Sequence, residues 1–494
     1  MSIKTAPPTT REKVSRTSRI SKGQLAILTV VVVASLRSLP TTATFGLGSI
    51  TLYVLPALIF LIPTALVAAE LATGWKGGVY VWVREALGNR WGFTAVWLQW
   101  IQNVVWYPVQ LAFIAAAIAF VIGDQHLANS GLFTAAVIVI LYYASTLVSL
   151  KGGTLFAKVG SWGGVIGTLI PGALLIVAGA VWLGLGLKSN APLHVHDVIP
   201  PFAGLSSIVL IVSSFLAYAG MEVNAVHVNE MEKPKRDYPK VIAIASALIL
   251  GVFVLPTIAI AVIVPKAQLG LTSGIMETFK LFFDHFGAGW LSPILAAAIG
   301  IGALASVVTW IAGPSKGLLL AGETGVLPKV LQRRNAAGVQ VGILVLQALI
   351  VTVLAALFIV IPNVSASFFT LVDMAAALYL LMYMLMFASA IVLRRTKPDV
   401  ARPYRVPAMT LVAGVGFCAS LGAFLLGFVP PAGLTGIPSA AYPYVVGAVI
   451  LVLGAPPLIF YALKKPSWIT HQIGDDTDDD DSSSHQEAEL RPAA

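Results

Sequence analysis

A glutamate interrupts one of the most apolar stretches of this chain. In the segment AYAGMEVNAVHVNEMEKPKRDYP, residues 217–239, Glu222 follows an apolar run that extends from Leu205 to Ala219. If this stretch crosses a membrane, a carboxylate there is expensive and must face a cavity or an internal partner. Groups of this kind carry protons or control a pathway, so Glu222 is a candidate coupling or gating residue.

Two basic residues, Arg37 and Lys316, also lie within apolar stretches. The guanidinium of Arg37 stays charged and offers a planar fork that suits carboxylates. We therefore expect Arg37 to pair with an internal acid, Glu222 or Asp373, or with an anionic group of a ligand. Lys316 lies toward the end of its stretch, where a long side chain reaches the interface, and is expected to be an anchor.

The composition places these residues in a polytopic membrane protein. Of the 494 residues, 57% are hydrophobic and only 11% are charged, and apolar runs of about 20 residues recur along the chain. The single cysteine, Cys418, lies in an apolar run and argues against disulfides and thiol catalysis. The chain contains no HExxH motif, and its GxSxG match, GPSKG at 313–317, lies within an apolar run and not at a strand-to-helix elbow, so an integral membrane enzyme is not indicated.

The apolar runs predict an all-α integral membrane protein with twelve transmembrane helices. A segment 1–23 precedes them, and a segment 465–494, with the acidic run DDTDDDD, follows them and is expected to be disordered. The predicted spans are 24–45, 49–70, 93–122, 131–150, 161–187, 205–229, 238–264, 290–320, 340–361, 368–394, 405–430 and 443–464.

The basic residues are distributed unevenly between the two sides of these spans. The chain has a net charge of +9, and the segments on the side of the N-terminus hold 26 of the 31 lysines and arginines. The opposite loops hold only Lys188, Lys266 and Lys280. The positive-inside rule therefore predicts cytoplasmic termini in the plasma (inner) membrane. It also explains the positive charge without a nucleic-acid partner.

The first and sixth spans are irregular. The first reads SLRSLPTTATFGLG after Ala34, and the sixth carries Gly220 just before Glu222. Helix breaks at membrane depth expose backbone groups that lipid cannot satisfy. Breaks at matching positions in two halves are typical of inverted-repeat transporters, here 24–187 and 205–394, followed by two further helices within 405–464. Simple kinks, tolerated by neighbouring helices, remain the alternative.

Three stretches carry a family resemblance. They are GMEVNAVHVNEMEKPKRDYP at 220–239, TWIAGPSKGLLLAGETGVLP at 309–328 and AELATGWKGGVYVWVREALGNRWGF at 69–93. From about residue 24 to about residue 464 the chain resembles the bacterial glutamate/γ-aminobutyrate antiporters of the amino acid–polyamine–organocation superfamily. The resemblance implies a 5+5 inverted-repeat (LeuT-like) core plus two extra helices, no cofactor, and exchange of an external amino acid for an internal decarboxylation product. Proton-coupled uptake, and a transporter-like receptor without flux, remain alternatives.

The resemblance also implies a substrate site at the two breaks. Half-helix ends present N–H groups to a carboxylate and free carbonyls to an amine. The residues expected to hold the carboxylate are Ser35, Leu36, Arg37 and Ser38. Those expected to hold the amine are Ala217, Tyr218, Ala219 and Gly220.

Three aromatic residues match the family's site. Trp310 matches a tryptophan of the eighth span whose face covers the substrate, although simple core packing remains open. Tyr379 and Tyr383, spaced i, i+4, match a tyrosine pair that closes over the substrate, with a core role as the alternative. For Glu222, the alternative is a structural carboxylate hydrogen-bonded to the backbone of the first span.

The chain also departs from the family's pattern. Arg37 stands where the family has a tyrosine, Ser306 where it has a glutamate, and Asp373 has no counterpart. The site has therefore gained a cation and lost an acid, while Asp373 adds a second coupling candidate. The acidic tail does not resemble the family's basic C-terminal plug, so gating by that plug is not carried over.

One histidine pair remains outside this site. His194 and His196 lie in the sequence HVHD of a loop expected on the outer side. Because two histidines without further clear ligands rarely make a metal site, we expect no metal here. The expected partners are the bilayer and a small amino acid or amine, in a monomer or homodimer.

Overall fold

The computed structural model is built of helices and describes residues 21–33, 35–151, 163, 165–202, 204–231, 233–431 and 437–470. Apart from one isolated bridge, between Thr324 and Ile469, this part of the chain contains no β-pairing. Most of the predicted N-terminal segment and the acidic tail after residue 470 lie outside the described residues.

The first half of the chain supplies the elements of five spans. They are α2 (Lys22–Val33), η1 (Leu36–Ser38), α3 (Leu39–Ala43), η2 (Gly46–Gly48), α4 (Ser49–Pro56), η3 (Ala57–Leu61), α5 (Ile62–Gly74), α6 (Gly78–Leu87), α7 (Asn89–Ile122), η4 (Gln125–Asn129), α8 (Gly131–Leu150), η5 (Val165–Leu169) and α10 (Ile170–Gly184).

The second half supplies seven more spans. Its elements are η6 (Val195–Val198), η7 (Leu205–Ser207), α11 (Ile211–Tyr218), α12 (Met221–Asn224), η8 (Ala225–Glu230), α13 (Pro234–Ile263), η9 (Lys266–Gln268), α14 (Gly274–His285), α15 (Leu291–Gly322), α16 (Val341–Ala355), α17 (Leu357–Val360), α18 (Val364–Thr396), α19 (Met409–Leu426), α20 (Tyr442–Gly454), α21 (Pro456–Ala462) and η10 (Pro466–Trp468).

The twelve-span prediction is confirmed, and the two broken spans account for the difference from a simple helix count. Within the described residues, ten continuous helices are long and apolar enough to cross a membrane. The two remaining spans are divided: the first into α2, η1 and α3, and the sixth into α11, α12 and η8. Each piece is too short to span a bilayer alone.

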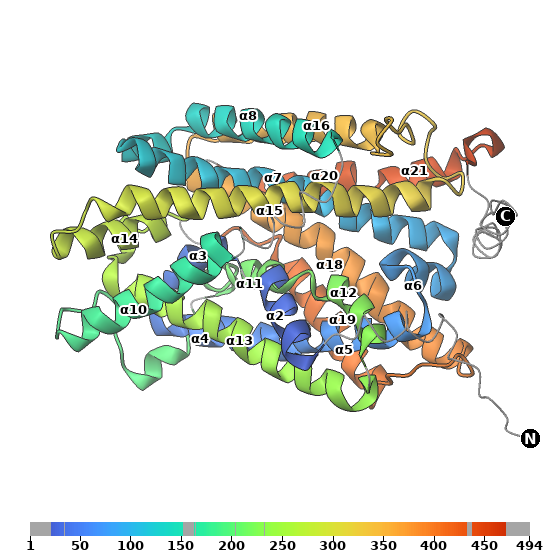
Figure 1. Cartoon of the computed structure of the whole chain (residues 1–494), viewed down its shortest axis with the longest axis horizontal. Helices are drawn as coiled ribbons and strands as arrows, with labels where there is room; N and C mark the ends of the chain where they lie inside the picture. The colour runs from blue at the N-terminus through green and yellow to red at the C-terminus, as the bar shows by residue number, and fades with distance from the viewer. Residues whose placement is uncertain are drawn as a thin grey trace, which may run out of the picture.

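Helix α7 lies at the centre of the bundle. Of its most apolar window, 78% is buried, the largest share of any described span. It packs against α6, α8, α15, α16 and α18. Figure 1 shows α8 and α16 side by side along one edge of the bundle, with α7 and α15 next to them. Residues on α7 therefore meet both halves of the chain.

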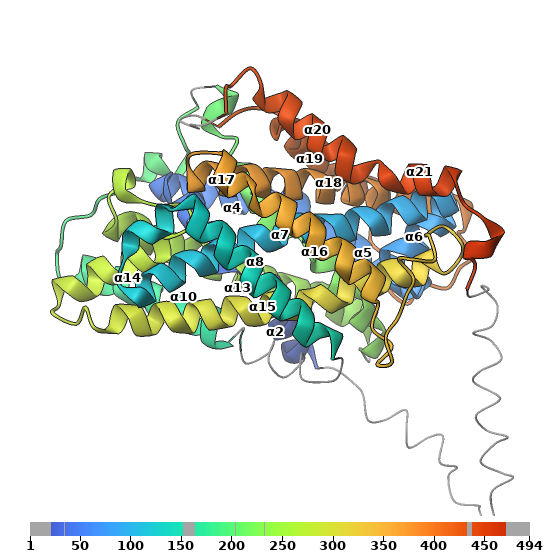
Figure 2. The same ribbon diagram turned by 90° about the horizontal axis from the view of Figure 1, so that it is seen from above.

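Two short amphipathic helices, α6 and α14, were not predicted. Val79, Trp82 and Val83 form the buried stripe of α6, and Ile275, Met276 and Phe279 form that of α14. A search for runs of about 20 apolar residues misses helices whose apolar residues recur only every three to four positions. The two helices lie at opposite ends of the bundle (Figures 1 and 2).

Three helices begin four residues before their predicted spans. Helix α7 begins at Asn89, α13 at Pro234 and α18 at Val364. Proline in the first turn of α13 needs no backbone N–H there, and the Asn363 side chain caps α18 by accepting from the N–H of Ala366. A proline in the first turn of α13 and a capping asparagine before α18 thus start these two helices ahead of their apolar runs.

The fifth and eighth spans approach each other through glycines. A Cβ on Gly167, in η5, would lie 2.3 Å from the Cα of Gly302 in α15. No side chain fits between the two backbones there, which is the close packing that small residues permit in membrane helices.

The break in the sixth span requires a glycine. Gly220 has a φ of +101°, a conformation that residues with a Cβ avoid. We predict that Gly220→Ala lowers the free energy of unfolding by about 1–2 kcal/mol. Gly251→Ala, in α13 with open space around its Cβ, is the control and should leave stability unchanged or slightly raised. Thermal unfolding in detergent compares the two variants, and equal effects would contradict the requirement.

Candidate functional site

The first span breaks at Ser35. Its backbone is extended, with φ −141° and ψ 128°, and the 3₁₀ turn η1 follows with Leu36, Arg37 and Ser38 all buried. Pro40, near the start of α3, allows the helix to resume because proline needs no partner for an N–H. The break therefore falls where the polar and proline residues of the sequence predicted it.

The sixth span breaks at Ala219 and Gly220. Ala219 is extended, with ψ 150°, and Gly220 turns the chain into α12. The Gly220 N–H donates to the hydroxyl of Tyr383 on α18, at 2.8 Å. A backbone donor freed by the break is thus satisfied by a side chain from another helix.

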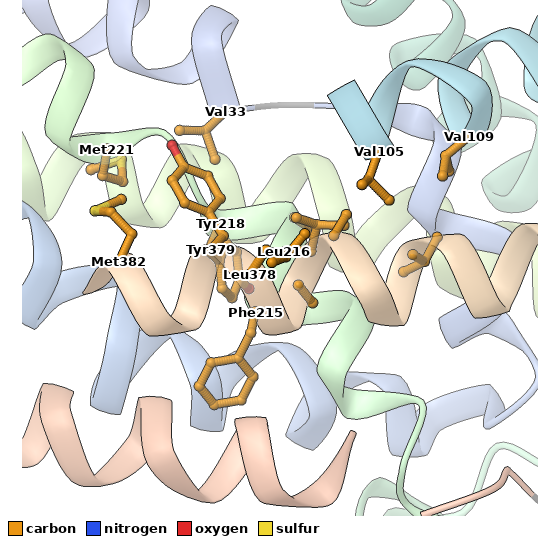
Figure 3. Close-up of a cluster of buried hydrophobic side chains, with 14 of the residues drawn as sticks. Val33, Val105, Val109, Phe215, Leu216, Tyr218, Met221, Leu378, Tyr379 and Met382 are labelled. Carbon is orange, nitrogen blue, oxygen red and sulfur yellow. The ribbon is translucent and has the colours of Figure 1, made fainter. Parts of the chain in front are cut away.

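Apolar side chains surround this break. Figure 3 shows Leu216 and Tyr218 of α11 near Leu378 and Tyr379 of α18, with Val105 and Val109 of α7 close by. The expected site residue Ala217 is buried in the same core, and Ala219 is half-buried against it. The Tyr218 hydroxyl donates to the carbonyl of Tyr53 in α4, at 2.9 Å. In this water-poor setting each polar contact carries more weight than at a surface.

Glu222 is 2% exposed and accepts three hydrogen bonds. Tyr379 and Tyr383 donate to different carboxylate oxygens, and Gln99 Nε2 of α7 donates at 3.1 Å to the oxygen that Tyr379 also binds. The expectation of an internal partner agrees with these contacts. The alternative of a bond to the backbone of the first span does not, because the partners lie on α18 and α7.

Tyr379 and Tyr383 form one unit on α18. Their rings are 4.8 Å apart, as the i, i+4 spacing on one helix face requires. Tyr383 accepts from Gly220 and donates to Glu222, so it connects the break to the carboxylate. The pair thus holds the broken sixth span, and its expected closure over a substrate stays a prediction.

Arg37 is buried, with 4% of its surface exposed, and stands over an aromatic ring. Its guanidinium carbon lies 5.8 Å from the centre of the Trp106 ring on α7. Its Nε atom has no hydrogen-bond partner, and no ion pair involves Arg37 within the described residues. The expected pairing with Glu222 or Asp373 is therefore not formed.

Asp373 faces away from the two breaks. Its side chain is fully buried, and Oδ2 accepts from the Tyr442 hydroxyl of α20 at 2.9 Å, while Oδ1 has no partner. Gly427, just beyond α19, lies beside that second oxygen. The expectation that Asp373 is available to Arg37 is wrong in this structure, because the acid points toward the last two spans.

Trp310 and Ser306 lie one helical turn apart on α15, and both are half-buried. The Trp310 carbonyl accepts from the Tyr107 hydroxyl of α7 at 2.8 Å. Trp106 is the neighbour of Tyr107, and their rings are 5.7 Å apart. Arg37, Trp106, Tyr107 and Trp310 therefore form a continuous chain of contacts from the first span to the eighth.

Three residues of α7 were missed as site candidates: Gln99, Trp106 and Tyr107. The signal was present, because the stretch WLQWIQNVVWYP at 97–108 is unusually rich in amide and aromatic residues for a membrane span. Gln99 and Trp106 are seven residues apart, which is two turns or about 10 Å along one helix face. One helix thus supports the carboxylate of Glu222 at one level and the guanidinium of Arg37 at another.

The arrangement suits a zwitterion. It offers a buried cation beside the first break, under the Trp106 ring of α7, and a hydrogen-bonded acid beside the second. A molecule with a carboxylate at one end and an amine at the other matches this order of charges.

Comparisons with known proteins agree with a transport role. The model of the amino acid permease family matches residues 20–453. The chain is 40% identical to an uncharacterized transporter of Legionella pneumophila, over 82% of this chain and 89% of that protein. It is 33% identical to a glutamate/gamma-aminobutyrate antiporter of Lactococcus lactis, over 88% and 89%. A probable agmatine/putrescine antiporter of Lactococcus lactis is 25% identical, over 80% and 83%. The resemblance inferred from the three motifs is confirmed.

The contacts of Glu222 predict the effect of removing its charge. In Glu222→Gln, the amide nitrogen cannot accept from a tyrosine, so one bond worth about 1.5–3 kcal/mol is lost. We expect transport to fall at least about tenfold in a folded protein, and Trp310→Ala to act in the same direction. Flux into proteoliposomes and thermal unfolding of the same preparations measure this.

The matched control is Glu277→Gln. Glu277 lies on α14 at the end of the bundle and also accepts side-chain and backbone hydrogen bonds, from Ser273 and Gly270. The Glu277→Gln variant should transport at the wild-type rate. Wild-type rates in well-folded Glu222→Gln protein would remove the coupling role.

Proposed function

Because the chain belongs to the amino acid permease family, we propose that it is an amino acid antiporter working by alternating access. It exchanges an external, glutamate-like amino acid for an internal amino acid or a decarboxylation product such as γ-aminobutyrate. Support comes from a relative named as a glutamate/gamma-aminobutyrate antiporter, aligned over most of both chains. Another aligned relative is named as a probable agmatine/putrescine antiporter.

Arg37 is the observation that carries the carboxylate specificity. A buried guanidinium without an acidic partner is costly at membrane depth, and binding a carboxylate removes that cost. In the proposal, the substrate carboxylate binds Arg37 and the free N–H groups around Ser35–Ser38. The Trp106 ring keeps the guanidinium in place.

The amine is assigned to the second break. Free carbonyls around Ala217–Gly220 receive an ammonium group, and Trp310 and Ser306 line the neighbouring α15. Glu222 acts through Tyr379 and Tyr383: a change in its charge alters the hydrogen bonds that hold Gly220. This connects a coupling event to the shape of the broken span.

Arginine at position 37 has a consequence for pH. A guanidinium remains protonated across the biological range, so it binds a charged carboxylate at any pH at which that carboxylate is ionised. The serine at position 306 adds no competing negative charge. We infer that the transporter handles carboxylate-bearing amino acids over a wider pH range than its glutamate/γ-aminobutyrate relatives.

Two other functions give different results in one assay. A proton-coupled permease, for which the buried Asp373 is the relevant group, accumulates substrate with a pH gradient and an empty lumen. A receptor binds substrate without flux. An exchanger releases labelled substrate only when a counter-substrate is present on the other side.

The main prediction concerns exchange and its dependence on Arg37. Wild-type protein should exchange glutamate against internal γ-aminobutyrate in proteoliposomes, saturably. Arg37→Ala should weaken substrate binding by at least about 2 kcal/mol, roughly thirtyfold in Kd, the scale of a buried charge-assisted bond. Binding is measured by titration, and the melting temperature is recorded on the same samples.

Arg84→Ala is the control, because Arg84 also stands over an aromatic ring, Tyr80, but on α6 at the end of the bundle. It should bind substrate as wild type does. Unchanged affinity in Arg37→Ala would reject the substrate role. A fall in apo stability as large as the fall in affinity would assign Arg37 a structural role.

We further propose that the chain lies in the plasma (inner) membrane with both termini cytoplasmic, as a monomer or homodimer. The support is the charge asymmetry, with 26 of 31 basic residues on one side.

Cysteine labelling tests the orientation. Cys418 is exposed and is first replaced by alanine. Thr10→Cys and Ser482→Cys should then resist an impermeant thiol reagent on intact cells, whereas Lys188→Cys, in an outer loop, should react. Labelling of residue 10 or 482 from outside would overturn the orientation.

A further inference from the structure

A donor cluster lies on the loop that joins the two repeats. His194, His196 and Asp197 each bring one ligand atom to within 4.8 Å of the others. The two histidines are mostly exposed, with 72% and 80% of their side-chain surface free, while Asp197 is only 22% exposed between them. The cluster takes no part in the contacts at the helix breaks, and it goes beyond the proposed transport function.

Asp197 supplies the third ligand that the histidine pair lacked in the sequence analysis, and, against the expectation of no metal there, we propose that these three side chains form a binding site for a divalent transition metal of the Zn²⁺ class. His194 Nδ1 lies 3.3 Å from Asp197 Oδ2, and His196 Nε2 lies 3.4 Å from Asp197 Oδ1. In a tetrahedral zinc site with bonds of about 2.0–2.1 Å, neighbouring ligand atoms lie roughly 3.3–3.4 Å apart. Each imidazole therefore has one nitrogen at ligand spacing from one of the two carboxylate oxygens of Asp197.

The backbone holds the donors in this arrangement. The His194 N–H donates to Asp197 Oδ2 at 3.0 Å, and the Asp197 N–H donates to the carbonyl of His194 at 2.9 Å. The two imidazole rings are stacked, 5.2 Å apart and 13° from parallel, so one of them must rotate for both nitrogen lone pairs to point at the same ion. The turn thus fixes the Asp197 carboxylate, while the two exposed histidine side chains can adjust to an ion.

The ligand set also selects the class of ion. Two imidazoles and one carboxylate suit Zn²⁺, Ni²⁺ or Cu²⁺, whereas Ca²⁺ and Mg²⁺ prefer oxygen ligands. Three protein ligands leave a fourth position for water.

The loop that carries the three donors contacts the second span, so metal binding there is expected to affect transport. Thr51 Oγ1 of α4 donates to the carbonyl of Val198 at 2.6 Å, and Pro200 packs on Gly48 at the start of the second span. The loop then leads through Leu205 into the broken sixth span. A metal on η6 stiffens this connection between the second and sixth spans, and we expect it to slow exchange.

Zn²⁺ binding to the full-length protein tests the site. The protein carries no polyhistidine tag, and Zn²⁺ alone is titrated by calorimetry. Wild type should bind one ion per chain that His194→Ala and Asp197→Asn weaken at least about tenfold. His126→Ala is the control, because His126 is exposed beside Asp124 in another loop and should bind as wild type does. The acidic tail is common to all variants, so its own metal binding cancels.

Two results would overturn the site: no Zn²⁺ binding by wild type beyond that of His194→Ala, or equal weakening in His126→Ala. Neither depends on transport, so this test fails or succeeds independently of the proposed function. External Zn²⁺ should also slow exchange in wild type but not in His194→Ala. Binding without any change in exchange would leave the site in place and reject the effect on exchange.

Discussion

The structure depends on satisfying backbone groups that two broken helices expose where lipid cannot bind them. At the sixth span this is done by a single hydroxyl, because Tyr383 accepts the N–H of Gly220. The same hydroxyl donates to Glu222, so the acid and the break cannot be treated separately. A buried carboxylate with three donors is well accommodated, and it keeps the two tyrosines in the orientation that the break requires.

Helix α7 connects the sixth-span break to the first-span break and to the eighth span. Through Gln99 it supports Glu222, and through Trp106 and Tyr107 it contacts Arg37 and Trp310. Both broken spans contact α7, which is deeply buried. A shift at one break is therefore transmitted to the other break through residues at fixed positions on α7. The charges at the breaks are treated differently: the acid is fully bonded by protein groups, whereas the guanidinium retains an unpaired Nε. Glu222 therefore stabilises the fold, whereas Arg37 is available to bind a ligand.

The sequence predicted what local patterns encode. Apolar runs placed the twelve spans, and Gly220 and the Ser35–Pro40 stretch marked both breaks correctly. The partners of Glu222 and Asp373 could not be read in the same way, because Tyr442, Tyr383 and Gln99 lie 69 to 161 residues away along the chain. Only packing decides that Asp373 meets α20 and not Arg37. The amphipathic α6 and α14 were missed because their apolar residues are too sparse for a test based on membrane-length runs.

The glycine contact between η5 and α15 bears on how such a bundle moves. Interlocked side chains would have to leave and re-enter their rotamers whenever two helices slide past each other. At Gly167 and Gly302 the backbones touch directly, with no room for a Cβ. This contact is close and has no interlocking side chains. We therefore expect it to hold the fifth and eighth spans at a constant separation and to offer little resistance when one span slides along the other. A single added methyl group at Gly167 would lie 2.3 Å from the Cα of Gly302, so it would push the two spans apart and disturb their packing as well as their sliding.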